Sequence, residues 1–341
     1  MKPTSQMSHA DGPDVAGSVP PHIEPVPDGV RRPLWSVMIP TYNCAGHLGE
    51  TLRSVLAQDA GEGFMQIEVV DDCSTRDDPE RVVREVGRGR VTFFRKPKNG
   101  GVTANFNTCL RRSTGRLVHL LHGDDYVLPG FYKCLEGLAS VREELALFAC
   151  RTNLMDEAGN MIHPSDRSPV LEQGSRDASL FFHETPILTP SIVVRRAFYE
   201  KHGGFLPSLV HTADWEMWAR AVDLAGGIVS HEVLACYRMH AGNDTSRLTR
   251  EAENLRDSAR CNAILAKRFP AFDRDRADRD LCTRARAQAE RFFKEGDFKA
   301  ARANRDYWRA NAPAGMRARR FLEGLQKRVS GFRKSGAAQE G

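Results

Sequence analysis

The sequence predicts an α/β protein built on a mostly parallel sheet with helices on both of its faces. Between residues 35 and 121, short apolar runs alternate with segments of helical periodicity, which is typical of parallel strands joined by crossover helices. Three of these apolar runs end in polar clusters. Because ligands of open α/β sheets bind beyond the carboxyl ends of the strands, we expect the three clusters to converge on one crevice.

Seven elements are expected in the first part of the chain. Pro40 closes the first apolar run, which predicts a buried strand. Leu48, Leu52 and Val55 then recur at helical spacing, and Pro79 suits the first turn of a second helix. In chain order the strands cover 35–39, 67–70, 91–94 and 117–121, and the helices cover 47–58, 78–86 and 103–112.

The pattern becomes mixed after residue 128, and the chain is helical and rich in Arg beyond about residue 250. Two helices of the segment 290–311 should meet at Gly296. The elements expected before them are helices at 131–141 and 214–222 and strands at 146–151, 191–194 and 227–237.

Three parts of the chain follow from this pattern. Residues 1–33 are rich in Pro and lack periodicity, which predicts a disordered lead with order beginning at Leu34. The α/β domain should span 34–248, and a basic helical C-terminal extension should span 249–341.

Charge is unevenly spread along the chain. Residues 251–341 carry 22 Lys and Arg against 13 Asp and Glu, a net +9, whereas the remainder carries 27 against 31, a net −4. Within 314–334, seven basic residues alternate with apolar residues at spacings of three and four. Such a helix is expected either to lie on anionic lipid or to pack as an ordinary terminal helix, and the sequence leaves both open.

Several classes of protein are disfavoured by the sequence. It has no apolar run of about 18 residues, no apolar leader, and eight cysteines without a CxxC pair, which favours reduced thiols. We therefore expect a cytoplasmic protein, to which the basic helix would add a peripheral contact with the inner face of the cell membrane. No GKS or GKT and no GxGxxG follows a strand, which argues against kinases and dehydrogenases.

Asp124 and Asp125 follow the fourth expected strand. Adjacent carboxylates repel each other unless a cation or hydrogen-bond donors compensate. Oxygen ligands suit Mg²⁺ or Mn²⁺, which commonly bridge substrate phosphates. The alternative is a solvated acidic turn, and the other polar clusters at the same sheet edge favour the metal site.

Asp72 ends the second expected strand and could accept a hydrogen bond from a nucleobase or ribose, although a turn or helix cap is an equally good interpretation. Tyr42 could lie flat against a base or pack at the domain edge. Asn99 and Gly100 belong to a turn before a helix. Such a turn lets the backbone approach a ligand and favours a diphosphate at the helix N-terminus.

Asp214 opens an expected helix, where a carboxylate is often only a cap but could also take a proton from a substrate hydroxyl. Trp215 could offer its face to a sugar ring, and Trp215 and Glu216 are expected on the acceptor side. At the end of the last strand, His240 could complete a metal shell and Arg238 could hold a phosphate. A structural role for His240 remains the alternative.

Taken together, these segments resemble the inverting family 2 glycosyltransferases, which have a GT-A fold with a Rossmann-like mixed, mostly parallel sheet. The resemblance covers roughly residues 34–245 and depends on the order of six motifs. The sequence departs from the family at Phe106, where many relatives carry an Arg before the Asn of the third motif. The motifs are SVMIPTYN, EVVDDCST, NGGVTANFN, LLHGDDYVLP, TADWEMW and YRMH.

The resemblance implies roles for individual residues. Pro40 and Tyr42 would lie by the base of a nucleotide-sugar, and Asp72 would contact that base. Asp124 would meet the ribose or the sugar. A second group of residues would act on the metal and the acceptor: Asp125 and His240 would hold Mn²⁺ or Mg²⁺, and Asp214 would be the catalytic base.

The implied reaction is metal-dependent, inverting transfer of a sugar of hexose type. The donor would be a nucleotide-sugar, with a UDP-sugar expected first, and the acceptor a hydroxyl of a glycan or lipid-linked molecule in cell-surface polysaccharide synthesis of the cell envelope. One alternative is a nucleotidyltransferase that forms nucleotide-sugars, which residues 41–46 disfavour because they lack a Gly-rich, basic loop. Another is a non-catalytic anion-binding module, which leaves the acidic crevice unexplained, so we expect no nucleic-acid partner.

Overall fold

The computed structural model describes residues 19–317 except 241 and 243. The chain divides into two compact units, Met1–His240 and Ala241–Gly341. The division precedes helix α8 (Asp244–Arg250), whereas the predicted boundary after residue 248 falls inside that helix. Among the described residues, no helix combines the length and the apolar character needed to cross a membrane.

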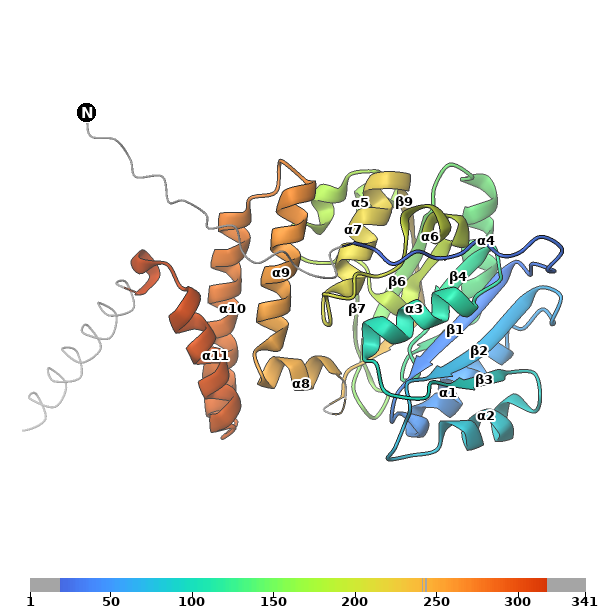
Figure 1. Cartoon of the computed structure of the whole chain (residues 1–341), viewed down its shortest axis with the longest axis horizontal. Coiled ribbons are helices and arrows are strands. Elements are labelled where there is room, and N and C mark those ends of the chain that lie inside the picture. The colour runs from blue at the N-terminus through green and yellow to red at the C-terminus, as the bar shows by residue number, and fades with distance from the viewer. Residues whose placement is uncertain (1–18, 241, 243, 318–341) are drawn as a thin grey trace, which may run out of the picture. The chain divides into compact units, whose positions relative to one another are not determined.

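The first unit is built on a mixed sheet with the strand order β3-β2-β1-β4-β8-β6-β9-β5, and β7 pairs with β6 (Figure 1). β1 lies between β2 and β4 and runs parallel to both, and β3 is parallel to β2. β8 is antiparallel to β4 and β6, while β9 is parallel to β6. The strands are β1 (Trp35–Thr41), β2 (Met65–Asp71), β3 (Thr92–Arg95), β4 (Leu117–Leu120), β5 (Tyr126–Val127), β6 (Leu147–Met155), β7 (Met161–Pro164), β8 (Ile192–Arg195) and β9 (Gly227–Arg238).

Helices flank this sheet, as the sequence predicts. One core cluster joins alternate β1 residues such as Val37 and Ile39 to apolar side chains of α1, α2 and α4. The intervening Met38 is equally buried but outside that cluster, and α3 packs across β1, β2 and β4 on that other face. The helices are α1 (Ala45–Leu56), α2 (Pro79–Gly87), α3 (Val102–Arg112), α4 (Phe131–Val141), α5 (Pro169–Glu172), α6 (Arg196–His202) and α7 (Ala213–Ala225), with 3-10 turns η1 (Ala178–Phe181) and η2 (Thr189–Ser191).

The structure confirms each strand and helix predicted within residues 35–238 to within a few residues. It adds β5 and β7, which the sequence analysis did not identify. β5 has two residues, too short for an alternating pattern, and all four residues of β7 are exposed, so the strand shows no buried face.

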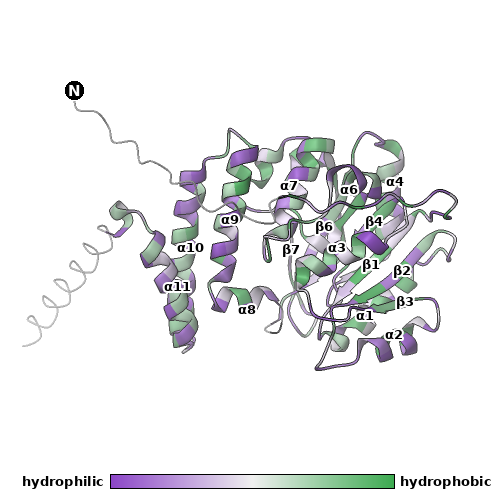
Figure 2. Cartoon of the chain, in the orientation of Figure 1, coloured by the Kyte–Doolittle hydropathy of each residue, from purple (hydrophilic) through white to green (hydrophobic). Residues whose placement is uncertain are grey.

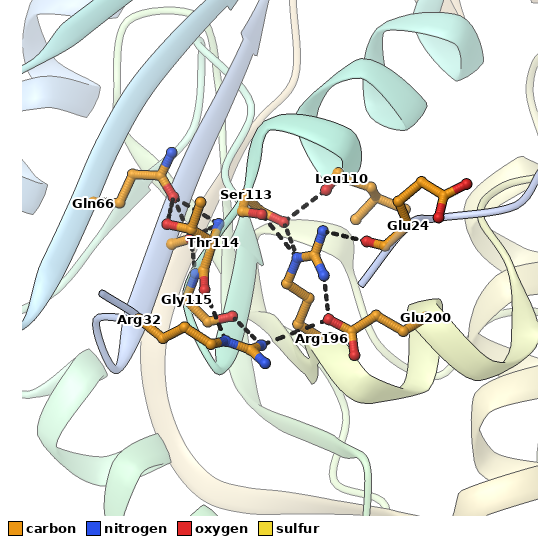
Figure 3. Close-up of polar contacts among 10 residues, drawn as sticks. Glu24, Arg32, Gln66, Leu110, Ser113, Thr114, Gly115, Arg196 and Glu200 are labelled. Atoms are coloured by element: carbon orange, nitrogen blue, oxygen red, sulfur yellow. Dashed lines mark hydrogen bonds and ion pairs between the residues drawn. The ribbon is translucent and has the colours of Figure 1, made fainter. Parts of the chain in front are cut away.

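The prediction that order begins at Leu34 is wrong for residues 19–33. Ile23 is fully buried, and Pro21 O accepts a hydrogen bond from Gly204 N–H (2.8 Å). Buried Arg196 donates to Glu24 O (3.0 Å) and to Ser113 O (2.8 Å), which ties this segment to the end of α3 (Figure 3). The sequence of this segment shows no hydrophobic periodicity, because the segment is held by the single buried side chain of Ile23 and by backbone hydrogen bonds rather than by a helix or strand. Residues 1–18 of the predicted lead lie outside the described part.

The second unit contains α8, α9 (Glu253–Arg268), α10 (Arg274–Lys294) and α11 (Phe298–Asn311). The predicted helix pair around Gly296 is confirmed, with Gly296 at φ 79° and Asp297 accepting from Ala300 N–H (3.0 Å) to cap α11. Figure 2 shows purple faces along these helices, and their small apolar core includes Leu281 and Trp308. The predicted basic helix over 314–334 lies outside the described residues from position 318 onward.

The turn before β4 requires a glycine for steric reasons. A Cβ on Gly115 would lie 2.5 Å from the Trp35 carbonyl carbon and 2.6 Å from Ser36 N. We expect Gly115→Ala to lower the free energy of unfolding by roughly 1–3 kcal/mol, because the backbone must move. Gly137→Ala is the control, since Gly137 is exposed in α4 with no atom within 4 Å and should gain about 0.5–1 kcal/mol of helix propensity. Urea titrations measure both, and equal effects would contradict this account.

His119 of β4 should make stability depend on pH. Its Nε2–H donates to Pro190 O (2.9 Å) and its Nδ1 accepts from the Tyr132 hydroxyl (3.2 Å), so the buried ring is neutral. Burial lowers its pKa from 6.5 to about 4. The unfolded chain therefore binds the extra proton first, and stability is lost as pH falls from about 6.5 toward 4.

At about 1.4 kcal/mol per pKa unit, His119 should account for a loss of roughly 2 kcal/mol between pH 7 and pH 5. Urea unfolding at both pH values measures the loss, and His119→Asn should remove this share of it. An unchanged pH dependence in the variant would show that His119 is not the responsible group.

Candidate active site

The carboxyl end of β1 brings the ends of β2 and β4 together. Thr41 O accepts from Asp72 N–H (2.9 Å) after β2, and Pro40 O accepts from Gly123 N–H (3.2 Å) after β4. The approach is close at Gly123, where a Cβ would lie 2.8 Å from Cys44 Sγ. The structure therefore confirms that the predicted polar strand ends meet at one edge of the sheet.

Asp125 follows β4 at this edge and is deeply buried, with 1% of its surface exposed. Its Oδ1 accepts from Arg238 N–H (2.9 Å). Its Oδ2 is buried without a hydrogen-bond partner and lies 3.5 Å from His122 Nδ1. Burial raises the pKa of Asp125 to about 6, with Asp124 adding to the effect and His122 opposing it.

Asp124 has a different environment from that of its neighbour. Its Oδ2 accepts from His240 Nε2–H (2.9 Å). Burial alone would raise the pKa of Asp124, but the hydrogen bond from His240 and the charges of His122 and His240 outweigh burial and lower it. The same hydrogen bond raises the pKa of His240. The predicted metal ligand His240 thus bonds a carboxylate in this structure.

Three side chains of this edge fit a divalent cation. His122, Asp124 and Asp125 each offer a ligand atom, and these atoms lie within 4.8 Å of one another. The unpartnered Oδ2 of Asp125 is the strongest sign of a fit, because a buried carboxylate oxygen needs a positive partner. The sequence analysis missed His122. His122 could have been identified from its position, because it follows β4 and precedes Asp124 by two residues.

The carboxylate of Asp72 is bound by the start of α3. It accepts from Gly100 N–H (3.0 Å) and Gly101 N–H (2.8 Å) and contacts Lys96 Nζ, while Asn99 Nδ2 donates to Asp72 O (3.2 Å). Asp72 therefore caps the start of α3, and its contact with a base remains a prediction. The diphosphate role expected for the Asn99–Gly100 turn is wrong for the Gly100 N–H, because a carboxylate already satisfies it.

Tyr42 follows β1 with 43% of its surface exposed, so its ring remains accessible at this edge. Pro40 is within β1, where it is paired in register with Val70 of β2. Tyr42 is thus accessible, whereas Pro40 is buried within the sheet; their roles at a base remain predictions.

Asp214 is in the first turn of α7. Its Oδ2 accepts from the Thr189 hydroxyl (3.0 Å), and its Oδ1 accepts from Trp215 N–H (2.8 Å). Asp214 is also one of the charges that act on His122: burial lowers the pKa of His122, but Asp125, Asp124 and Asp214 together raise it. Asp214 therefore lies near enough to His122 for its charge to act on that ring.

The acceptor-side roles expected for Trp215 and Glu216 are wrong. Trp215 is 8% exposed, and its indole N–H donates to Phe181 O (2.6 Å), so its ring packs inside the protein. Glu216 is buried in an ion pair with Arg220 (2.8 Å). Both side chains therefore lie on the buried side of α7.

The phosphate role expected for Arg238 is also wrong. Its buried guanidinium donates to Asp124 O (3.1 Å) and Glu157 O (3.0 Å) and pairs with Glu50 (2.5 Å). Since its backbone N–H also binds Asp125, Arg238 holds the acidic pair in place.

Phe106, the position at which the sequence departs from the family motif, lies against the same cluster. Its ring stacks on His122 with centroids 5.3 Å apart and planes 9° apart. Phe205 contacts Phe106 from another side (5.2 Å). This stack fixes the plane of the His122 ring beside the carboxylates.

Comparison with known proteins identifies the family of this chain. The model of glycosyl transferase family 2 matches residues 36–203. An uncharacterised glycosyltransferase of Rickettsia prowazekii (strain Madrid E) is 27% identical over 235 residues, covering 67% of this chain and 71% of that protein. Chondroitin synthase of Escherichia coli is 29% identical over 223 residues, covering 63% of this chain and 30% of that enzyme.

Among solved structures, residues 1–349 of S. aureus TarS in complex with UDP-GlcNAc match with a TM-score of 0.53 and 18% identity. The match covers 73% of this chain and 70% of that chain, and it shows the fold alone. The sequence matches and the fold together lead to one conclusion: the chain belongs to glycosyl transferase family 2 and is a glycosyltransferase with a GT-A fold.

Proposed function

We propose that this chain transfers a sugar from a UDP-sugar to a hydroxyl of a glycan or lipid-linked acceptor, with inversion, in synthesis of a cell-envelope polysaccharide. The observation that carries the proposal is the buried, half-partnered carboxylate of Asp125 at the strand edge. The polysaccharide product is supported by the similarity to chondroitin synthase. UDP is the nucleotide proposed because the TarS neighbour holds UDP-GlcNAc.

A divalent cation, Mn²⁺ or Mg²⁺, would be held at Asp125, with Asp124 beside it. When bound, such an ion neutralises the charge that builds on the leaving nucleoside diphosphate. Arg238 and His240 orient these carboxylates through hydrogen bonds. Arg238 N–H donates to Asp125, and the His240 ring donates to Asp124. Both carboxylates are therefore oriented before any ligand arrives, which reduces the reorganisation needed on binding.

The nucleoside would lie at the other end of the same edge. Tyr42 exposes its ring after β1 and can lie flat against a base. Asp72 would accept from the base, with its carboxylate held in one orientation by the N–H groups at the start of α3. Pro40 shapes the floor between them as part of β1.

Asp214 is proposed as the general base. Its carboxylate is oriented by the Thr189 hydroxyl, which belongs to a different element from α7 and so fixes the side chain from two sides. From this position it would take the proton of the acceptor hydroxyl, while the oxygen attacks the anomeric carbon opposite the diphosphate.

Asp214→Asn should reduce sugar transfer by about 10²–10⁴-fold, which is the usual contribution of general-base assistance. Binding of the nucleotide should stay near normal, because Asp214 is proposed to touch only the acceptor. Initial rates with saturating donor and calorimetric binding of UDP measure the two effects. Asp275→Asn is the control, an aspartate in the first turn of α10, and it should leave both unchanged. Transfer at the parental rate by Asp214→Asn would refute the base assignment.

Asp125→Asn tests the donor site and separates it from folding. The amide oxygen can still accept from Arg238 N–H, and the change removes a buried charge, so the fold should persist. A thermal-shift screen of UDP-, GDP- and dTDP-sugars with and without Mn²⁺ should show the largest shift for a UDP-sugar with Mn²⁺ in the parent protein.

The same screen should show no Mn²⁺-dependent shift in Asp125→Asn. No shift with any nucleotide-sugar in the parent protein would contradict the proposed function, and an undiminished shift in the variant would place the cation elsewhere.

A further inference from the structure

The buried face of α3 carries two polar side chains that the proposed function does not use. Thr103 and Asn107 lie one helical turn apart in the third motif of the sequence. Each is only 4% exposed. Polar groups buried this deeply need hydrogen-bond partners, and the partners of these two side chains show which part of the chain α3 holds in place.

The partners belong to the loop of residues 203–212, which joins α6 to α7. The side-chain amide of Asn107 forms two buried hydrogen bonds with the backbone of Phe205. Its Nδ2 donates to Phe205 O (2.9 Å), and its Oδ1 accepts from Phe205 N–H (2.8 Å). Further along the loop, the Thr103 hydroxyl donates to Leu209 O (2.5 Å). α3 therefore holds this loop at two places.

The loop also approaches α3 very closely at Gly204. A Cβ on Gly204 would clash with Asn107 Oδ1, and that oxygen is held in place by its bond from Phe205 N–H. Gly204 O accepts from Arg220 of α7 (2.8 Å). The loop is thus bound both to α3 and to the helix that carries the proposed base.

The anchored loop leads directly to that base. Leu209 lies shortly before Asp214 in the chain, and Asp214 is in the first turn of α7. The Thr189 hydroxyl orients the carboxylate of Asp214, but the backbone at the start of α7 continues from the loop. Because a displacement of about 1 Å in a reacting group can reduce a rate by about 100-fold, the anchors of this loop should matter for sugar transfer.

The start of α3 lies on the donor side of the site. The N–H groups of Gly100 and Gly101 bind the carboxylate of Asp72, and Asn105 Nδ2 donates to Val70 O of β2 (2.9 Å). One helix therefore contacts both the proposed nucleoside site and the loop before the base, so its own rigidity can fix the separation of the two.

We propose that α3 positions the general base relative to the donor, with Thr103 and Asn107 as positioning residues that act through the loop of residues 203–212. The inference rests on the proposed function, because it takes Asp214 as the base. Neither positioning residue touches a substrate in this account. Their loss should therefore reduce turnover without weakening the binding of the donor.

Thr103→Val removes the hydroxyl but keeps the size of the side chain. With UDP-GlcNAc as donor and chondroitin oligosaccharides as acceptor, we expect kcat for UDP release to fall by roughly 10–100-fold. The KM for UDP-GlcNAc and the calorimetric affinity for UDP should stay near their parental values. Thr103→Ser keeps the hydroxyl and should restore kcat. Thr108→Val is the matched control, because the Thr108 hydroxyl donates to Ala104 O within α3 (2.9 Å).

Hydrogen exchange of the full chain, followed by mass spectrometry, tests the anchoring without any substrate. Thr103→Val should exchange faster than the parent protein in peptides that cover 203–216, and at the parental rate in β1 and β2. Asn107→Asp is a second variant, which decides if Thr103→Val fails to fold. It keeps the acceptor for Phe205 N–H but loses the donor to Phe205 O, so it should show the same local change and the same fall in kcat.

Three results would overturn the inference: a parental kcat in Thr103→Val, unchanged exchange of 203–216 in both variants, or a loss of kcat accompanied by an equal loss of UDP affinity. Failure of the proposed function is distinguishable, because it shows as parental transfer by Asp214→Asn or as no transfer by the parent protein. In the latter case the exchange measurement still decides whether α3 holds the loop. Transfer lost in Asp214→Asn but retained in Thr103→Val would refute the inference alone.

Discussion

The site depends on a carboxylate that is buried with one of its two oxygens unpaired. Asp125 is held after β4 by Arg238 N–H on one side, while its other oxygen makes no hydrogen bond and lies 3.5 Å from His122 Nδ1. Burial raises the pKa of Asp125, which means that the folded protein resists charging this group on its own. A cation at the same place reverses that preference. Burial of Asp125 therefore makes the site a better cation site than an exposed acidic pair would be.

Much of the neighbouring chemistry serves to hold that carboxylate and its partner. The sequence predicts that Arg238 binds a phosphate. In the structure its guanidinium instead forms an ion pair with Glu50 and donates hydrogen bonds to two backbone carbonyls. His240 binds Asp124. The two carboxylates of the acidic pair are thus each oriented by another residue, Asp125 by Arg238 and Asp124 by His240. Such support explains why several polar residues in the motifs are buried.

The fold could be predicted from sequence because alternating apolar runs and helical periodicity report directly on burial, as in Val37 and Ile39 of β1. The convergence of strand ends followed from the parallel order. The direction of each side chain could not be predicted. Trp215 and Glu216 follow the proposed base in sequence, yet helical geometry turns them to the interior. Asp72 caps α3 because Gly100 and Gly101 return to it across 28 and 29 residues, a contact that no local pattern encodes.

The most direct test of the central claim is a crystal structure of the chain grown with Mn²⁺ and UDP, with anomalous diffraction recorded on both sides of the manganese absorption edge. We predict one strong anomalous peak at Asp125 Oδ2, with the diphosphate on the far side of the ion and the uracil near Tyr42. A manganese peak remote from β4, or UDP bound with no metal at this edge, would contradict the account.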